Sequence, residues 1–256
     1  MISSPPALQL YSVRKQLATG RAPVLRRIAA FGYGAVEPYD VRTDPERLRA
    51  DLDEAGLAVC AVHAKALGED ADVLLRGTQA VGGGTVIVPS VPRMRFADGD
   101  AIAALAHELN ESAAKAAGYG LRLGYHNHEF ELASLVGGRT GLEVLADALD
   151  PAVILEVDTY WAAVGGQDVP QLLGRLGDRV RYLHVKDGPV TRQDPQTAVG
   201  GGRMPVAEIL AACPSAEWHV VELDSCATDM LTAVGDSLAW LAEHDLARPV
   251  RGGAGS

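Results

Sequence analysis

Short apolar runs alternate with longer segments of helical pattern along almost the whole chain. Eight of these runs are rich in Val, Ile and Leu, and several of them are nearly continuous. Such runs are typical of parallel strands, which are buried on both faces. We therefore predict eight strands, at residues 7–12, 34–38, 57–64, 85–90, 121–128, 152–158, 180–186 and 218–224.

Helical signals fill the intervals between the apolar runs. The clearest signal opens with Asp44 as N-cap and Pro45 in the first helical position, and it closes at Gly56. A long Ala-rich segment at 100–120 also ends at glycines. We predict eight helices, at residues 22–32, 44–56, 65–81, 100–120, 141–149, 168–177, 205–213 and 229–244.

This alternation of strands and helices favours a (β/α)8 TIM barrel. A doubly wound sheet is the competing architecture, and it would place a Gly-rich phosphate turn after the first strand. "LYSVRKQL" has no such turn, and "VGGGT" (81–85) precedes a strand instead of following one. We predict one barrel domain at residues 1–246 and a flexible, Gly-rich tail at 247–256.

Composition narrows the class of partner. The chain has 256 residues, a formal net charge of -10 and no basic run, which argues against nucleic acid or an anionic membrane as a partner. No apolar run reaches the roughly 18 residues of a membrane-spanning helix, and the N-terminus lacks the pattern of a signal peptide. Three cysteines without a CxxC pair suit a reducing compartment, so we expect a cytoplasmic protein.

Ionisable side chains stand at the ends of most predicted strands. In a barrel of this kind the active site is built at the C-terminal ends of the strands. Where two such residues are two positions apart, both share one face of the strand. The side chains are Glu37, His63, His126 with His128, Glu156 with Asp158, His184 with Lys186, and Glu222 with Asp224.

A ring of carboxylates and imidazoles inside a barrel has two interpretations. Buried like charges repel one another, so they must be protonated, paired or bound to a cation. A divalent metal ion held by His, Asp and Glu ligands would satisfy them together, and we favour this interpretation. The alternative is a network of buried ion pairs with Lys186 and Arg14.

The motifs that carry these residues resemble the sugar phosphate isomerase/epimerase family of xylose-isomerase-like barrels, which is related to inosose dehydratase. The resemblance covers residues 7 to 243, with one motif near each strand. Each motif is weak alone, and their order and spacing make the combination specific. The motifs are "LQLYSVR", "GYGAVE", "YHNHEFE", "EVDTYW", "GRLGDRVRYLHVKD" and "VVELD".

The resemblance implies one divalent ion, of manganese, cobalt, magnesium or zinc, held by residues from the last four strands. Three ligands of the family map onto Asp158, His184 and Glu222. The first ligand is a Glu in related enzymes, and this chain has "YHNH" there instead. We expect His126 to take that place, with Glu131 from the following loop as the alternative.

The activity implied by the resemblance is isomerisation or epimerisation of a sugar or polyol through a metal-stabilised enediolate. Glu222 and His126 would move the proton, and Lys186 or His63 would act as the acid. The fifth-strand Glu is missing, so symmetric two-carboxylate epimerisation is in doubt. A lyase that performs β-elimination on a keto sugar or keto-inositol is therefore the first alternative. The expected substrate contacts are Glu37, His128, Trp161 and Tyr11.

Some of these residues have a plainer interpretation, and other classes of protein remain as alternatives. Glu37 could be a salt-bridge partner, His63 a core histidine, and Trp161 a cover for the barrel end. A non-catalytic sugar-binding barrel would keep the fold without the metal, and the acidic charge disfavours an endonuclease. The identity of the sugar and its phosphorylation stay open from the sequence. The oligomeric state is open too, with a homo-oligomer among the alternatives.

Overall fold

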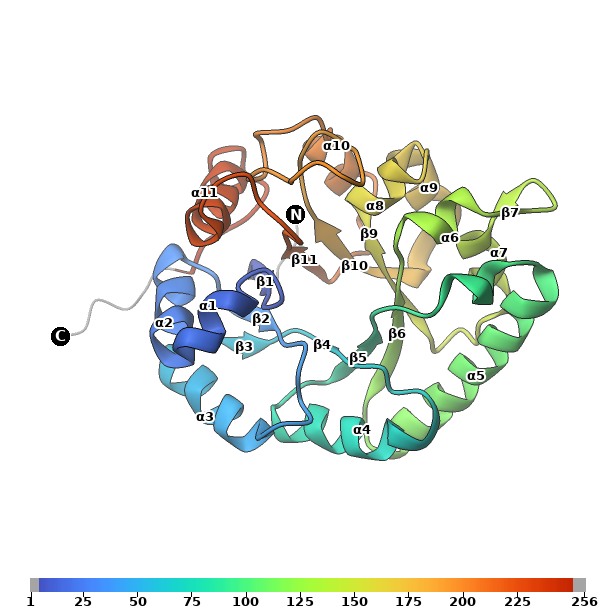
Figure 1. The fold of residues 1–256 in the computed structure, drawn as a ribbon, viewed down its shortest axis with the longest axis horizontal. Helices are drawn as coiled ribbons and strands as arrows, with labels where there is room; N and C mark the ends of the chain where they lie inside the picture. Colours follow the sequence, from blue (N-terminus) through green and yellow to red (C-terminus); the bar gives the residue numbers. More distant parts are fainter. Residues whose placement is uncertain (1–4, 251–256) are drawn as a thin grey trace.

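The computed structural model describes residues 5–250, which form a closed parallel barrel surrounded by helices (Figure 1). All strand pairs of the barrel are parallel, in the order β3-β2-β1-β11-β10-β9-β6-β5-β4. The strands are β1 (Ala7–Gln9), β2 (Ala35–Glu37), β3 (Ala58–Val59), β4 (Val62–His63), β5 (Thr85–Val88), β6 (Arg122–His126), β9 (Ile154–Asp158), β10 (Val180–Val185) and β11 (Trp218–Val221).

The barrel closes through β3 and β4, which are two halves of one predicted strand. The strand is interrupted at Cys60 and Ala61. On one side, the Cys60 N–H donates to the carbonyl of Val36, and on the other the Ala64 N–H donates to the carbonyl of Ile87. One strand therefore joins both ends of the sheet, which confirms the predicted eight-stranded TIM barrel.

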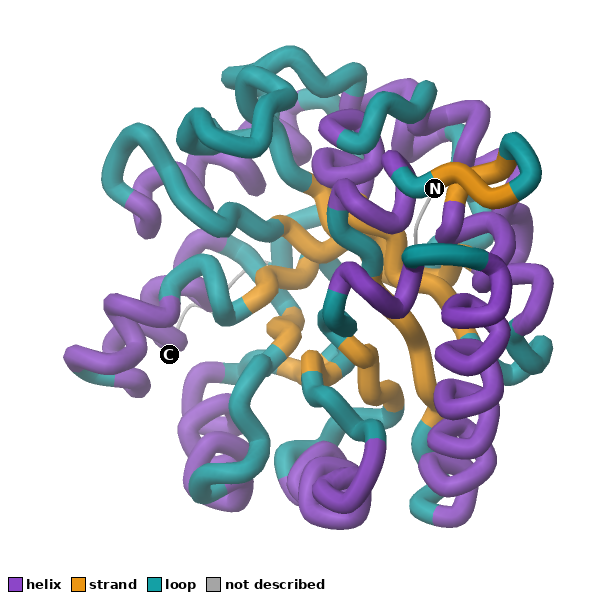
Figure 2. The backbone as a smooth tube through the Cα atoms, turned by 45° about the vertical axis from the view of Figure 1, so that its right-hand side comes forward, coloured by secondary structure: helices purple, strands orange, loops and turns teal. Residues whose placement is uncertain are grey.

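Eight helices at the predicted places cover the outside of the barrel, as Figure 2 shows in a second view. The segment predicted as a helix at 65–81 starts later than expected, because a 3-10 turn at Gly68–Asp70 precedes it. The helices are α2 (Arg21–Phe31), α3 (Pro45–Ala55), α4 (Ala71–Ala80), α5 (Gly99–Gly118), α7 (Gly141–Ala148), α9 (Val169–Leu176), α10 (Val206–Ala211) and α11 (Met230–Glu243).

Additional short elements follow the strands at their C-terminal ends, and the sequence did not predict them. Three are short helices, α1 (Arg14–Thr19) after β1, α6 (Glu129–Ala133) after β6 and α8 (Thr159–Val164) after β9. A small antiparallel hairpin of β7 (Leu135–Val136) and β8 (Arg139–Thr140) follows α6. These elements shape the end of the barrel where the polar side chains gather.

The barrel interior is divided into an apolar and a polar layer. Alternation along a strand sends every second side chain inward, so most strands contribute to both layers. The lower layer, called here the apolar plug, consists of Ala7, Ala35, Cys60, Ala61, Ile87, Ile154, Tyr182 and Val220, all buried. The plug lies at the N-terminal half of the strands and gives the polar layer above it a dry floor.

The C-terminal segment returns to the outside of α2. The Val250 N–H donates to the carbonyl of Gly32 at 2.8 Å, and residues 251–256 of the predicted tail lie outside the described residues. Within residues 5–250, no helix combines the length and apolarity needed to cross a bilayer.

Candidate metal centre

Directly above the plug, the barrel interior is polar. Six of these side chains come two positions after a plug residue on the same strand, and the seventh, His126, comes two positions after Gly124. None of them is more than 7% exposed. We call them the polar layer: Gln9, Glu37, His63, His126, Glu156, His184 and Glu222.

One carboxylate oxygen gathers three imidazoles of the polar layer. Glu156 Oε2 lies 2.6 Å from His63 Nε2 and 3.0 Å from His126 Nδ1, and 3.2 Å from His184 Nε2. Burial alone would raise the pKa of Glu156, but His184 and His63 hold that pKa well below its usual range. Glu156 is therefore an anion balanced by its histidines.

Glu37 is a second carboxylate at the same depth. Its Oε2 accepts from Gln9 Nε2 at 2.7 Å and lies 2.7 Å from His184 Nε2 and 3.2 Å from His63 Nε2. Burial, followed by repulsion from Glu156, raises the pKa of Glu37 to about 7. Two carboxyl groups thus share the histidines, and one of them retains its proton more readily.

Three residues of the polar layer and Asp158, which follows Glu156 on β9, bring one ligand atom each within 4.8 Å of one another, an arrangement able to hold a metal ion. We call them the candidate metal group: His126, Asp158, His184 and Glu222.

Asp158 is held in place by its own backbone and by the start of α8. Its Oδ1 caps α8 by accepting from the Trp161 N–H at 2.8 Å. The Asn127 side-chain amide bonds both the N–H and the carbonyl of Asp158, at 3.0 and 3.3 Å. The remaining oxygen, Oδ2, is buried, pairs with Lys186 Nζ at 2.8 Å, and lies 3.7 Å from His126 Nε2.

The candidate metal group fits a divalent ion by the chemistry of its donors. It offers two imidazole nitrogens and two carboxylates, the mixed set that first-row divalent ions accept. Asp158 Oδ2 already faces one cation, the Lys186 ammonium at 2.8 Å, so this oxygen lies where positive charge is stabilised. His184 Nδ1 is 2.8 Å from Glu222 Oε2, so this imidazole also faces the group.

Lys186 supplies a permanent positive charge beside these carboxylates. Its Nζ lies 2.8 Å from Asp158 Oδ2, 2.6 Å from Glu222 Oε2 and 2.7 Å from Asp224 Oδ2. Burial opposes the charge, but Asp158 and its neighbours keep the pKa of Lys186 well above its usual value. Arg14 takes no part in this network, because it donates to the backbone carbonyls of Tyr11 and Asp224.

A cavity of about 350 Å³ opens above the polar layer. Its size suits a small polar molecule, and its walls combine aromatic rings with charged groups. It is lined by Tyr11, Tyr39, His63, Pro89, Ser90, His126, His128, Glu222 and Asp224.

Residues 25–244 match the family described as xylose isomerase-like TIM barrel. The chain belongs to this family. The family assignment drawn from the sequence motifs is thereby confirmed. The match spans every strand of the barrel except β1, and it includes the candidate metal group.

Solved structures share the family fold at low sequence identity. A sugar phosphate isomerase/epimerase from Parabacteroides distasonis superimposes with a TM-score of 0.82 and 22% identity, over 97% of this chain and 96% of that chain. A probable 3-DHS dehydratase from Bacillus anthracis gives a TM-score of 0.72 and 11% identity, over 93% of this chain and 99% of the other. These likenesses establish the fold alone.

A local sequence match points to one further relative. Inosose dehydratase from Geobacillus kaustophilus (strain HTA426) is 36% identical over 69 residues. The match covers 27% of this chain and 21% of that protein, so it relates one segment of the two molecules.

Within this family fold, the two predicted candidates for the first ligand occupy different places. His126 belongs to the candidate metal group. Glu131 is fully buried in α6, where its oxygens accept from the Tyr125 hydroxyl at 2.8 Å and from the His128 N–H at 3.0 Å. Burial raises the pKa of Glu131 to about 7. The geometry therefore favours His126.

The predicted substrate contacts divide between the cavity wall and its surroundings. Tyr11 and His128 line the cavity, and His128 Nδ1 is buried without a hydrogen-bond partner. Glu37 lies beneath the cavity, in the polar layer. The Trp161 ring lies 5.7 Å from Lys186 Nζ and does not line the cavity.

Sequence reasoning missed Tyr39 as a wall of the cavity. Its ring packs edge-on against Tyr11, with the centroids 5.4 Å apart. A signal was present, because Tyr39 stands two positions after Glu37 and thus continues the inward face of β2.

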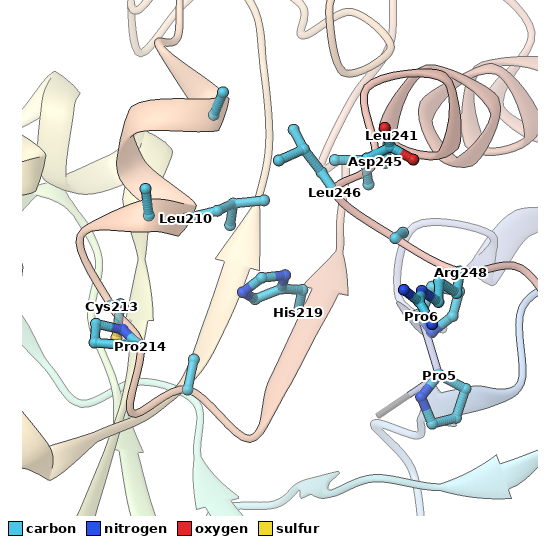
Figure 3. Close-up of a pocket in the computed structure, with 14 residues that line it drawn as sticks. Pro5, Pro6, Leu210, Cys213, Pro214, His219, Leu241, Asp245, Leu246 and Arg248 are labelled. Carbon is cyan, nitrogen blue, oxygen red and sulfur yellow. The ribbon is translucent and has the colours of Figure 1, made fainter. Parts of the chain in front are cut away.

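A second hollow, of about 400 Å³, lies at the N-terminal end of the barrel (Figure 3). It contains none of the predicted site residues. His219 of β11 lies in it with Nε2 buried and unpartnered, and burial lowers the pKa of His219 to about 4. The hollow therefore holds a neutral imidazole, with Asp245 and Arg248 among its other lining residues, and the clustered buried charges lie at the other end of the barrel.

Proposed function

We propose that this chain is a metal-dependent isomerase or epimerase that acts on a small sugar or polyol by removing a proton next to a carbonyl. The observation that carries the proposal is the convergence of the candidate metal group, two of whose members, His126 and Glu222, line the 350 Å³ cavity. A bound divalent ion would polarise the substrate carbonyl and so lower the cost of removing the neighbouring proton. Manganese, cobalt, magnesium and zinc are the candidate ions, and the two imidazoles favour the first-row metals.

Glu222 and Lys186 are the proposed proton-transfer residues. Burial opposes the charge on Glu222, but Lys186 and His184 hold the pKa of Glu222 well below its usual value, so it is ionised and able to accept a proton. Lys186 lies 2.6 Å from Glu222 and keeps its proton; its proposed role is to stabilise the charge that develops on a substrate oxygen. His126 and His63 line the same cavity and are proposed to contact the reacting region.

A lyase is the second candidate, favoured by the one-sided distribution of these groups. His126 stands on β6 where a symmetric epimerase would need a second carboxylate base. A base and an ammonium acid side by side, as in Glu222 and Lys186, suit β-elimination, in which the acid protonates the leaving oxygen. The segment shared with inosose dehydratase supports the same direction.

Metal content is the first measurement. We would load the purified protein with manganese or cobalt and compare wild type with Asp158→Asn and Glu222→Gln. Glu143→Gln is the matched control, since Glu143 is a buried carboxylate that caps α7 away from the site. We expect about one ion per chain in wild type and control, and strong loss in both site variants.

Substrate screening follows with keto sugars, keto-inositols and their phosphates. Exchange of the substrate α-hydrogen with deuterium from D₂O would report proton removal, and product analysis would separate isomerisation from elimination. Absence of any bound ion in the loaded wild type would overturn the metal-dependent mechanism and favour a non-catalytic sugar-binding barrel. The acidic charge supports a small molecule over nucleic acid as the partner, and three cysteines without a CxxC pair support a cytoplasmic setting.

A further inference from the structure

The two histidines of the candidate metal group approach it with different nitrogens. His126 turns Nε2 toward Asp158, and its Nδ1 lies 3.0 Å from Glu156 Oε2. His184 turns Nδ1 toward Glu222, and its Nε2 lies among the carboxylates beneath the group. Each ring therefore has one nitrogen on the side of the proposed metal and the opposite nitrogen on the side of the polar layer.

We infer that Glu156 is a positioning residue that sets the tautomer and the ring orientation of His126, and, together with Glu37, those of His184. The inference rests on the proposed metal site. A histidine ligand needs an acceptor for the N–H that does not face the metal, and this acceptor fixes which nitrogen is free to coordinate. Glu156 Oε2 is that acceptor for His126, and no other side chain among residues 5–250 bonds His126 Nδ1 in this structure.

A carboxylate can only accept hydrogen bonds. His126 must therefore carry its proton on Nδ1, which leaves the lone pair on Nε2 directed at the candidate metal group. His184 has carboxyl groups at both nitrogens: Nε2 is 2.7 Å from Glu37 Oε2 and 3.2 Å from Glu156 Oε2, and Nδ1 is 2.8 Å from Glu222 Oε2. An ion bound on the Nδ1 side would leave the proton of this ring on Nε2, where Glu156 accepts it. Glu156 thus explains how a histidine can replace a carboxylate ligand on β6. The negative charge that a ligand carboxylate would bring is supplied by Glu156, which bonds the nitrogen of His126 on the side away from the proposed metal.

A second metal ion is the rival explanation for this cluster. His63, His126, Glu156 and His184 also place one ligand atom each within 4.8 Å of one another. The contact of 2.6 Å between His63 Nε2 and Glu156 Oε2 is normal for a charge-assisted hydrogen bond, and the single Oε2 atom also meets His126 Nδ1 at 3.0 Å. Hydrogen bonding therefore accounts for this cluster without an ion, and the number of ions bound per chain separates the two explanations. We therefore assign Glu156 to hydrogen bonding, with the nitrogens around its oxygen as donors.

The test is the tautomer of His126, read by long-range ¹H–¹⁵N correlation spectra of the metal-free protein with labelled histidines. The variants are Glu156→Gln, which adds an N–H donor at the same size, and Glu156→Asp, which keeps the acceptor. We expect wild type to show His126 protonated at Nδ1, Glu156→Gln to lose that fixed tautomer, and Glu156→Asp to recover it. The control Glu143→Gln should leave the spectrum of His126 unchanged.

Metal affinity gives the second readout. Loss of such a partner is expected to weaken metal binding about 10- to 100-fold while leaving one ion per chain at saturation. An unchanged His126 tautomer and an unchanged affinity in Glu156→Gln would overturn the inference. Two ions in wild type and one in the variant would instead make Glu156 a ligand and would also overturn it. If wild type binds no ion, the proposed function fails, and the tautomer experiment still decides the role of Glu156.

Discussion

At the scale of single residues, the site follows from strand parity. Apart from β5, where Pro89 follows Ile87, each strand that places an apolar side chain in the plug places a polar one two positions later, as Ile154 and Glu156 do on β9. This pattern is readable in the sequence because the period of a strand is two. Which nitrogen or oxygen faces the centre is not readable, because it depends on partners from other strands.

The first ligand is the sharpest prediction at this scale. We expect His126→Ala to weaken metal binding at least about 100-fold, because it removes a donor from the candidate metal group. Glu131→Gln should leave the metal affinity within about threefold, because both oxygens of Glu131 serve the start of α6. Isothermal titration of both variants checks this. A loss of affinity in Glu131→Gln alone would reverse the assignment.

At the scale of elements, the sequence predicted the strands and the long helices but not the short helices that end in the site. α6 and α8 have five and six residues, and helices of this length form only through tertiary contacts. α8 starts at Asp158 because that side chain caps it, so a candidate ligand and a helix start are the same residue. A pattern search that looks for long periodic segments cannot find such an element.

The segment between β10 and α10 shows another local device. Asp187 is buried and its carboxylate accepts from the backbone N–H groups of Gly188, Gly200, Gly202 and Met204, at 2.8 to 3.1 Å. The same segment carries Gln196, whose side chain bonds Asp224 at the cavity wall through both of its polar atoms. One carboxylate therefore folds a long loop against the site.

We expect Asp187→Asn to loosen this loop, because an amide presents one acceptor oxygen in place of two and adds a donor among N–H groups. The amide hydrogens of Gly200, Gly202 and Met204 should exchange faster with deuterium, and the free energy of unfolding should fall by about 1–3 kcal/mol. Hydrogen-exchange mass spectrometry checks the first effect. Metal stoichiometry should stay at the wild-type level, since Asp187 lies outside the candidate metal group. Unchanged exchange in this loop would contradict the anchoring role.

At the scale of the whole molecule, the two ends of the barrel differ in the charged groups that they contain. The C-terminal end holds the clustered charges, and the N-terminal end is fastened by ordinary ion pairs. Glu217 accepts from Arg122 of β6 at 2.7 and 2.9 Å and from Arg181 of β10 at 2.9 Å. The eightfold alternation predicted this overall shape, because a closed barrel is the common solution for such a pattern.

The contribution of the Glu217 ion pairs to folding stability should decrease in acid. Hydrogen bonds from Arg122 lower the pKa of Glu217 to about 2, below the unfolded value of about 4.3. A depressed carboxyl pKa stabilises the folded state above the unfolded pKa, and this contribution is lost as pH falls from about 4 toward 2. Partial exposure reduces its size to about 1–2 kcal/mol.

The check is urea unfolding of wild type and Glu217→Gln at pH 7 and near pH 3. Glu217→Gln should be less stable than wild type at pH 7, and the difference should shrink at the lower pH. A difference that does not depend on pH would mean that Glu217 contributes only through packing.

The apolar plug also affects the exchange of hydrogen isotopes between the polar layer and solvent. Because Ala7, Ile87, Tyr182 and their neighbours seal the barrel from below, a proton accepted by the layer above can reach water only through the mouth, which a bound substrate would cover. A proton held in a cavity with one opening is therefore returned to the substrate more often than it exchanges with water. If the proposed proton transfer takes place, part of a tritium label on the substrate should be retained in the product beside the part that exchanges with solvent, and smaller side chains in the plug should reduce the retained part.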